Sequence, residues 1–318
     1  MANKLEVGPA EAGQSILRFL ERRLNCPKAS IYRWLRSGEI RVNGGRGKPD
    51  RVLAAGDLVR VPPQAGDENG PALSACMIGQ AALGQNLRII FQDNEILVLD
   101  KPRGLPVHGG TRHKDSLAGR IKAACLADCG EGAYVPAPAH RLDLQASGLI
   151  LAGKTHASQV RLHALFRESK IELEREYLCW VRGNAVATFT EALLCVDFLS
   201  EERDAKGRER AAVVSEGGKE ARAWYNCLEV RNDAKFGTVS LMRAKLLTGR
   251  KHQIRVQLAA RGFPLLGDWR YGGSRQIPMM LHAGRVALPA PNARIFISVP
   301  DWTGIFTVGE EHVQAAAS

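Results

Sequence analysis

The stretch that decides how this chain folds is residues 140–155, HRLDLQASGLILAGKT. Its last eight residues match the phosphate-loop pattern G-x-x-x-x-G-K-[ST], in which backbone N–H groups curl around a phosphate. The four variable positions, residues 149–152, are a continuous apolar run that is typical of a buried strand and not of an exposed loop. The stretch therefore predicts a strand without a nucleotide site, and it makes Lys154 a charge at the end of that strand.

The polar residues before this strand are the better candidates for chemistry. The segment HRLD places Asp143 in a loop at the start of the strand, and loops at strand ends commonly carry catalytic groups. A carboxylate in such a loop can also do no more than cap backbone donors in a turn. This segment alone leaves both interpretations open.

Segments on either side of this stretch indicate a mixture of strands and helices. Residues 88–102 predict two strands about a turn at Asp93-Asn94, and residues 177–181 and 238–249 predict further strands. Residues 156–170 and 252–262 have helical spacing. Because strands and helices do not alternate regularly, the pattern favours an α+β class with a mixed, mainly antiparallel sheet and flanking helices.

The first 62 residues predict a small separate α/β unit. Residues 14–26 carry apolar residues on one helical face, and a second helix is expected between Ser30 as its cap and Gly38 as its end. Short strands with a turn at Asn43-Gly44 follow. This segment holds 12 Lys and Arg against 6 Asp and Glu, over half of the net charge of +11 in a fifth of the chain. Such an excess suits a phosphate backbone, although a solvated basic face would look the same.

Composition and spacing bound the remaining possibilities. The chain of 318 residues is long enough for two domains, and it has no apolar run long enough to span a bilayer and no secretory leader, so a cytoplasmic protein is expected. Cys125 and Cys129 lie four apart with no second pair at metal spacing, so no metal is expected. We expect domains at residues 1–62 and 87–310, a linker at 63–86 and a tail at 311–318.

The motifs ASIYRWLRSGEIRVNG (residues 29–44) and AGDLVRV (residues 55–61) resemble the αL RNA-binding domain. In that family two helices present basic side chains to structured RNA. The resemblance assigns this role to Lys28, Arg33, Arg36 and Arg41.

Four further motifs, in this order, resemble the RluA family of pseudouridine synthases and, within it, the RluC branch. They are residues 140–155, EREYLCWVRG (174–183), LLTGRKHQIRVQLAARGFPLLGDWRYGG (246–273) and LHAGRVAL (281–288), with KPRGLPVHGG (101–110) in support. The resemblance implies the pseudouridine synthase fold and isomerisation of uridine in large-subunit ribosomal RNA, with no cofactor.

Carried over by position, the family's catalytic aspartate falls on Asp143, and the arginine paired with it falls on Arg255. Tyr177 becomes the active-site tyrosine, which can stack on uracil or relay a proton from its carbon five. Arg141 becomes the arginine that helps to displace the target base. Where the family commonly has Asp-Thr, this chain has Gln145 and Ala146.

Basic side chains near these motifs are further candidates for phosphate contacts: Lys101, His108, Arg250 and Lys251. The expected partner is large-subunit ribosomal RNA or a pre-ribosomal particle, and the expected state is a monomer without membrane attachment. Two alternatives stay open, a synthase that acts on tRNA and a non-catalytic RNA-binding assembly factor on the same scaffold.

Overall fold

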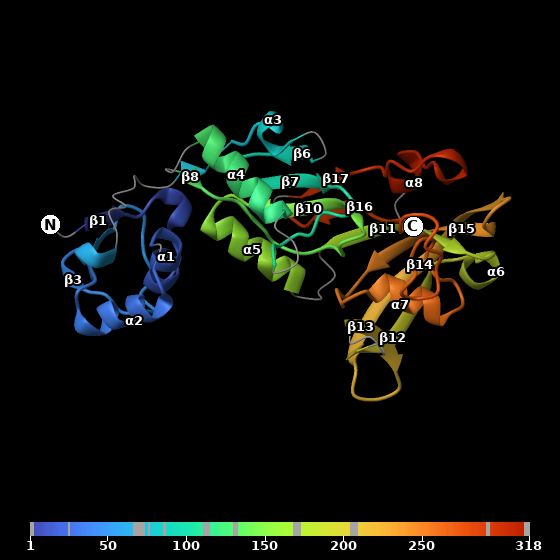
Figure 1. The fold of residues 1–318 in the computed structure, drawn as a ribbon, viewed down its shortest axis with the longest axis horizontal. Helices are drawn as coiled ribbons and strands as arrows, with labels where there is room; N and C mark the ends of the chain where they lie inside the picture. Colours follow the sequence, from blue (N-terminus) through green and yellow to red (C-terminus); the bar gives the residue numbers. More distant parts are fainter. Residues whose placement is uncertain are drawn as a thin grey trace.

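The described residues form two units (Figure 1). This computed structural model describes residues 3–24, 26–65, 74–75, 77–84, 87–110, 115–129, 133–167, 173–203, 209–290 and 293–314. Of the helices within these residues, none is long and apolar enough to cross a membrane.

The first unit is a four-stranded antiparallel sheet covered by two helices. Its strands lie in the order β1-β4-β2-β3. Their bounds are β1 Asn3–Glu6, β2 Arg41–Val42, β3 Gly45–Arg46 and β4 Leu58–Val61, and the helices are η1 Pro9–Glu11, α1 Ile16–Arg23, α2 Lys28–Ser37 and η2 Pro63–Ala65. Ile16, Phe19 and Leu20 on α1 pack with Trp34 of α2 in a core of its own.

Helix α2 ends as expected but begins earlier. Gly38 closes it in the left-handed conformation, with φ of 78°. Its start was predicted wrongly, because Pro27 and not Ser30 precedes the first turn. Proline suits the beginning of a helix, since its φ is already near the helical value and the N–H that it lacks would have no helical partner there.

The second unit is built on one large mixed sheet that is antiparallel in all but one of its described pairings. Within the described residues it has eleven strands in the order β13-β12-β14-β15-β11-β16-β10-β7-β6, with β9 and β17 attached to β10 and β16. The parallel pair is β10 with β16. The bounds are β6 Arg88–Gln92, β7 Ile96–Lys101, β9 Ala137–Pro138, β10 Ser147–Gly153, β11 Glu174–Arg182, β12 Leu193–Arg203, β13 Glu209–Val214, β14 Lys219–Asp233, β15 Gly237–Leu246, β16 Leu281–Leu288 and β17 Arg294–Ile297. This confirms the expected α+β class with a mainly antiparallel sheet.

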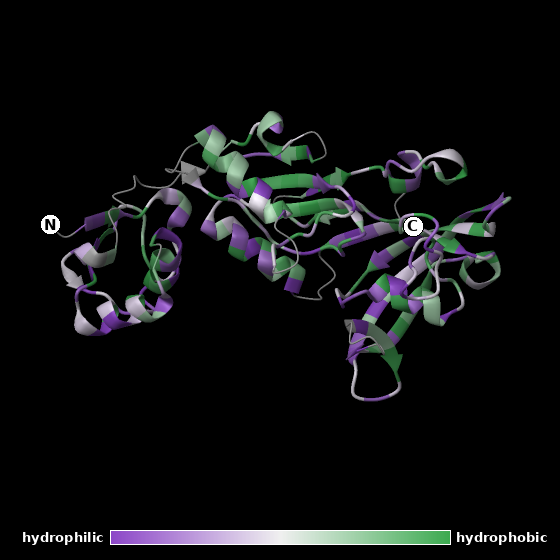
Figure 2. Ribbon diagram, viewed as in Figure 1, coloured by the Kyte–Doolittle hydropathy of each residue, from purple (hydrophilic) through white to green (hydrophobic). Residues whose placement is uncertain are grey.

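Helices flank this sheet (Figure 1). They are α3 Gln80–Leu83, α4 Leu117–Cys129, α5 His156–Arg167, α6 Val186–Phe189, α7 Gln253–Ala260, η3 Gly304–Phe306 and α8 Glu311–Gln314, and a small pair of strands, β5 Ser74–Ala75 and β8 Ala133–Tyr134, lies beside α4. The strands between the helices are the most hydrophobic part of the unit (Figure 2). In the expected linker, Ile78 and Leu83 are buried in the core of this unit, and in the expected tail Val313 is buried as well.

The apolar run of the opening stretch forms the centre of β10. Residues 149–152 are all fully buried and pair antiparallel with β7. This leaves no loop in which N–H groups could surround a phosphate. Lys154 stands at the end of this strand as expected, but its side chain does not reach the surface. Its side chain is fully buried, and its Nζ donates to the Asp93 carbonyl and lies 3.5 Å from Gln92 Oε1, because the β6–β7 turn folds over it.

Candidate active site

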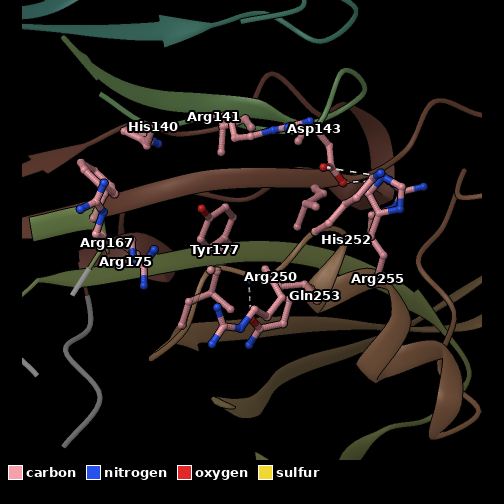
Figure 3. A pocket seen from close by; sticks show the side chains of 18 of the residues that line it. His140, Arg141, Asp143, Arg167, Arg175, Tyr177, Arg250, His252, Gln253 and Arg255 are labelled. Carbon is pink, nitrogen blue, oxygen red and sulfur yellow. Dashed lines mark hydrogen bonds and ion pairs between the residues drawn. The ribbon is translucent and has the colours of Figure 1, made fainter. Parts of the chain in front are cut away.

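The loop before β10 and the helix α7 bring together the two residues predicted to form the centre of the site. Asp143 Oδ2 accepts a hydrogen bond of 2.8 Å from Arg255 Nη1, across 112 residues of sequence (Figure 3). Both side chains are largely buried. A charge-assisted pair of this length fixes the orientation of the carboxylate.

Arg255 is itself held by a second carboxylate. Its Nε and Nη2 donate to the two oxygens of Asp268 at 2.6 and 2.9 Å, which is the bidentate geometry that suits a guanidinium. Burial lowers the pKa of Arg255, but the hydrogen bonds and charges of Asp268 and Asp143 outweigh this and raise it overall. Arg255 therefore stays charged and points one nitrogen at Asp143.

Two glycines allow close backbone approaches beside the two carboxylates and so help to position them. Gly148 follows the Asp143 loop with φ of 110°, and a Cβ there would lie 2.3 Å from the Ala283 carbonyl oxygen on β16. Gly267 precedes Asp268 with φ of 78°, and a Cβ there would lie 2.1 Å from the Pro278 carbonyl oxygen. Only glycine allows these close approaches of backbone to backbone.

His252 is the residue before α7, and its ring faces Asp143. It has φ of 54°, and its Nε2 lies 3.9 Å from Asp143 Oδ1. Its Nδ1 is 2.8 Å from the hydroxyl of Tyr271, which accepts a hydrogen bond from Ala211 N–H. When the phenol donates a hydrogen bond to Nδ1, the single proton of the neutral ring is on Nε2, on the side of Asp143. Burial lowers the pKa of His252 to about 4, so the ring is neutral at pH 7.

Tyr177 extends from β11 into the same cavity, between Asp143 and the arginines at the other end of the pocket (Figure 3). A break in the register with β16 falls between Glu176 and Tyr177. Burial raises the pKa of Tyr177, so its phenol is protonated at neutral pH. Both roles expected of Tyr177, stacking on the base and relaying a proton from carbon five, stay predictions.

Lys101 lies beneath the Asp143 loop and not on the surface. It is fully buried, and its Nζ donates to the carbonyl oxygens of Pro102, Leu105 and Ala146 at 2.9, 3.0 and 2.6 Å. The expectation that Lys101 contacts RNA was therefore wrong, because the end of β7 turns its side chain inward. The ammonium supports the loop, since Ala146 N–H in turn donates to the Asp143 carbonyl.

Asp143, Tyr177, His252 and Arg255 line a cavity of about 700 Å³. Arg141, Arg250 and Lys251 of the predicted RNA contacts lie on its wall, with Arg250 donating to the Glu220 carbonyl and Lys251 paired with Glu201 at 3.0 Å. The other predicted contacts lie elsewhere: His108 is exposed in a neighbouring cavity, and on the first unit Lys28, Arg33, Arg36 and Arg41 are exposed.

Several residues of the site were missed from the sequence. Asp268 and Tyr271 stand in the segment GDWRYGG, which ends the motif at residues 246–273 and was given no role for either residue. Arg167 and Arg175 add charge to the cavity wall opposite Arg255 (Figure 3). The neighbouring glycines were a signal for that loop, but nothing local to Asp268 indicates its partner 13 residues away.

Comparison with known proteins agrees with this fold and this cavity. The sequence model of the RNA pseudouridylate synthase family matches residues 95–260. The chain belongs to this family, and it is an RNA pseudouridine synthase, an isomerase.

Individual relatives extend the match over nearly the whole chain. Ribosomal large subunit pseudouridine synthase C of Pasteurella multocida is 34% identical over 287 residues, which covers 89% of this chain and 82% of the relative. The protein of the same name from Escherichia coli K12 is 35% identical over 278 residues, 86% and 81%.

Solved structures show the same fold. Human RNA pseudouridylate synthase domain containing 4 superimposes with a TM-score of 0.54 and 22% identity, over 67% of this chain and 88% of that one. Human RNA pseudouridylate synthase domain containing 1 gives 0.54 and 23%, over 71% and 86%.

Proposed function

We propose that this enzyme converts specific uridines of large-subunit ribosomal RNA to pseudouridine, with Asp143 as the carboxylate that begins the reaction. The names of the relatives from Pasteurella multocida and Escherichia coli support the substrate. The observation that carries the role of Asp143 is its geometry: a carboxylate at the wall of a cavity, oriented by Arg255 and faced by a neutral His252.

The reaction requires one bond between uracil and ribose to break and another to form. The C1′–N1 bond breaks, the uracil turns, and C5 bonds to C1′; C5 then loses its proton to solvent and N1 gains one. Asp143 acts at the ribose, as nucleophile at C1′ or as base at the 2′ position, and both routes need the same ionised carboxylate. Tyr177 supplies a flat surface beside the turning base.

The target uridine has to leave its stack to reach Asp143, which costs a few kcal/mol. Arg141 is exposed two residues before Asp143, on the wall of the cavity. The proposal assigns to it the filling of the gap that the base leaves. Arg250 and Lys251 face the same opening and are assigned to phosphates.

The proposal also covers the first unit and the surroundings of the enzyme. Residues 1–62 act as an RNA-binding domain through the exposed Lys28, Arg33, Arg36 and Arg41, and residues 87–310 carry the catalysis. The enzyme works in the cytoplasm as a monomer, on ribosomal RNA or on a pre-ribosomal particle.

The substitution Asp143→Asn tests the catalytic role, because it keeps the size of the side chain and removes its charge. We expect tritium release from RNA labelled with [5-³H]uridine to fall by more than about 1,000-fold, and RNA affinity to stay within about threefold. Asp301→Asn, at an exposed aspartate away from the cavity, should keep full activity. Turnover by Asp143→Asn near that of the parent would overturn the assignment.

Mapping pseudouridines in total RNA with and without the gene tests the substrate. Loss of sites in large-subunit ribosomal RNA is the expected result. Loss of pseudouridine sites in tRNA alone would mean that tRNA is the substrate, and the role of Asp143 would be unchanged.

A further inference from the structure

A second cavity lies where the two units meet. It has a volume of about 570 Å³ and is open to solvent between α1 of the first unit and α5 of the second. Arg18 and Arg22 of α1 form part of one wall, and Val160 and His163 of α5 form part of the other.

Contacts between the two units hold these walls together. The guanidinium of Arg22 lies 4.6 Å from the centre of the Tyr134 ring in the second unit. Gly13, with φ of 86°, lies against His156 at the beginning of α5, where a Cβ would be 3.9 Å from the ring carbon Cδ2. The groove is therefore a product of packed residues on both units.

This groove continues into the active-site cavity. Ala139, His140, Arg141 and His163 line both. Three of these four residues, Ala139 to Arg141, lie just before Asp143 in the chain. A strand whose nucleotide occupies the active site therefore reaches the groove without leaving the protein surface.

The charges of the groove suit a phosphate backbone. Arg18, Arg22 and Arg141 are exposed along it. The one acidic side chain among its described lining residues, Glu21, is already paired with Lys28 at 2.6 Å. Burial, followed by the charges of Arg22 and Arg18, lowers the pKa of His156, so this imidazole is neutral and the arginines carry the charge at pH 7.

We propose that this groove binds the RNA strand that continues from the target nucleotide, and that Arg18 and Arg22 contact its phosphates. The inference rests on the proposed function and deepens it: α1 and α5 together hold the flanking strand, while the outward residues of α2 meet other parts of the RNA. Contacts to phosphate hold any sequence equally, so the groove contributes affinity and register and does not select the uridine.

The test uses the full-length enzyme and a fluorescein-labelled oligouridylate of ten nucleotides, titrated at several salt concentrations. Each phosphate contact to a single strand contributes about 0.7 to the slope of log affinity against log salt. The double variant Arg18→Ala/Arg22→Ala should therefore flatten the slope by about 1.4 and weaken binding at least tenfold at low salt. Lys122→Ala/Arg182→Ala is the matched control, because it removes two exposed cations that line neither cavity. Equal slopes for the two double variants, or no binding of the probe to the parent enzyme, would overturn the inference.

A second variant approaches the groove from its other wall. Val160 is 49% exposed on α5, so Val160→Glu adds a carboxylate facing the strand without disturbing the core. On a transcript of large-subunit ribosomal RNA, we expect this variant and the double variant to raise KM at least fivefold and to change kcat less than threefold. If the parent enzyme is active and the variants have the same KM as the parent, the inference about the groove is refuted and the proposed function stands. If the parent enzyme is inactive on this transcript, the proposed function is refuted.

Discussion

A buried lysine lies at each end of β10, but the two ends differ in their relation to the active site. At its beginning, Lys101 is buried and donates to three carbonyl oxygens, one of which belongs to the loop of Asp143. At its end, Lys154 is buried and donates to the Asp93 carbonyl of the β6–β7 turn. A buried ammonium thus holds a turn at both ends of the strand, and only the turn at the beginning carries the proposed catalytic carboxylate.

This comparison depends on the strand between the two ends. Ile150 is fully buried at its centre, so Ile150→Asp would bury a carboxylate with no partner. We expect it to lower the free energy of unfolding by more than about 4 kcal/mol, measured by urea denaturation. Val196→Asp, on the exposed face of β12, is the control and should change it by less than about 1 kcal/mol. Equal effects at the two positions would mean that residues 149–152 are not a buried strand.

The next prediction separates the two lysines. Lys101→Met and Lys154→Met keep the side-chain length and remove the donor, and each should lower the free energy of unfolding by about 2–4 kcal/mol because buried carbonyls lose a partner. Only Lys101→Met should reduce kcat in the folded protein, by about 10–100-fold, since Ala146 then no longer holds the Asp143 loop.

Tritium release measured where circular dichroism shows both variants folded gives the answer. Equal kcat for Lys101→Met and the parent would mean that the lysine supports the fold alone. A similar loss in Lys154→Met would remove the difference between the two ends of the strand.

Local pattern was enough to predict the strand itself, but not what surrounds it. The apolar run of residues 149–152 and the Asp93-Asn94 turn are signals of a few neighbouring residues, and both are present where expected. The burial of Lys101 and Lys154 was not expected, because a charged residue at a strand end is normally exposed and because each has an acceptor far away in the chain, at 45 and 61 residues.

The same limit applied to the site. Asp143, Arg255 and Tyr177 could be assigned because the motifs around them resemble a known family in order and spacing. Asp268 and the contact of Tyr271 with Ala211 depend on the folding of the sheet, 13 and 60 residues from their partners. No residue type near either position indicates such a contact.

The pKa of Lys101 predicts how kcat depends on pH and so tests the role of the Asp143 end of β10. Burial lowers the pKa of Lys101 from the usual 10.5 to about 8, although Asp143 and Asp100 oppose this. Above pH 8 its amine keeps two N–H groups for three carbonyls, so we expect kcat to fall a few-fold between pH 7.5 and 9.5. His252, with a pKa of about 4, remains neutral across this range.

The contribution of Lys101 to the free energy of unfolding should rise with pH over a similar range, whereas kcat falls. Between about pH 8 and 10.5 the unfolded chain holds a proton on Lys101 that the folded chain has lost, so the contribution of this group to the free energy of unfolding rises with pH. The difference between the parent and Lys101→Met, followed by urea denaturation at each pH, isolates it. A difference that stays constant or shrinks with rising pH would contradict the lowered pKa.

The smallest expected effect concerns the Lys154 end and nucleotides. The sequence GLILAGKT would bind ATP if residues 149–152 were a loop, but they pair with β7 along their whole length. A phosphate loop with a Kd of about 10 μM would add about 2.7 kcal/mol to the free energy of unfolding when the Mg-ATP concentration is about a hundred times the Kd. For a domain of this size, that corresponds to a rise of several degrees in Tm. We expect a change of less than about half a degree, for the parent and for Lys154→Met alike, in thermal melts with 1 mM Mg-ATP. A rise in the parent that disappears in Lys154→Met would show that the lysine holds a phosphate, and the two ends of β10 would then both be functional.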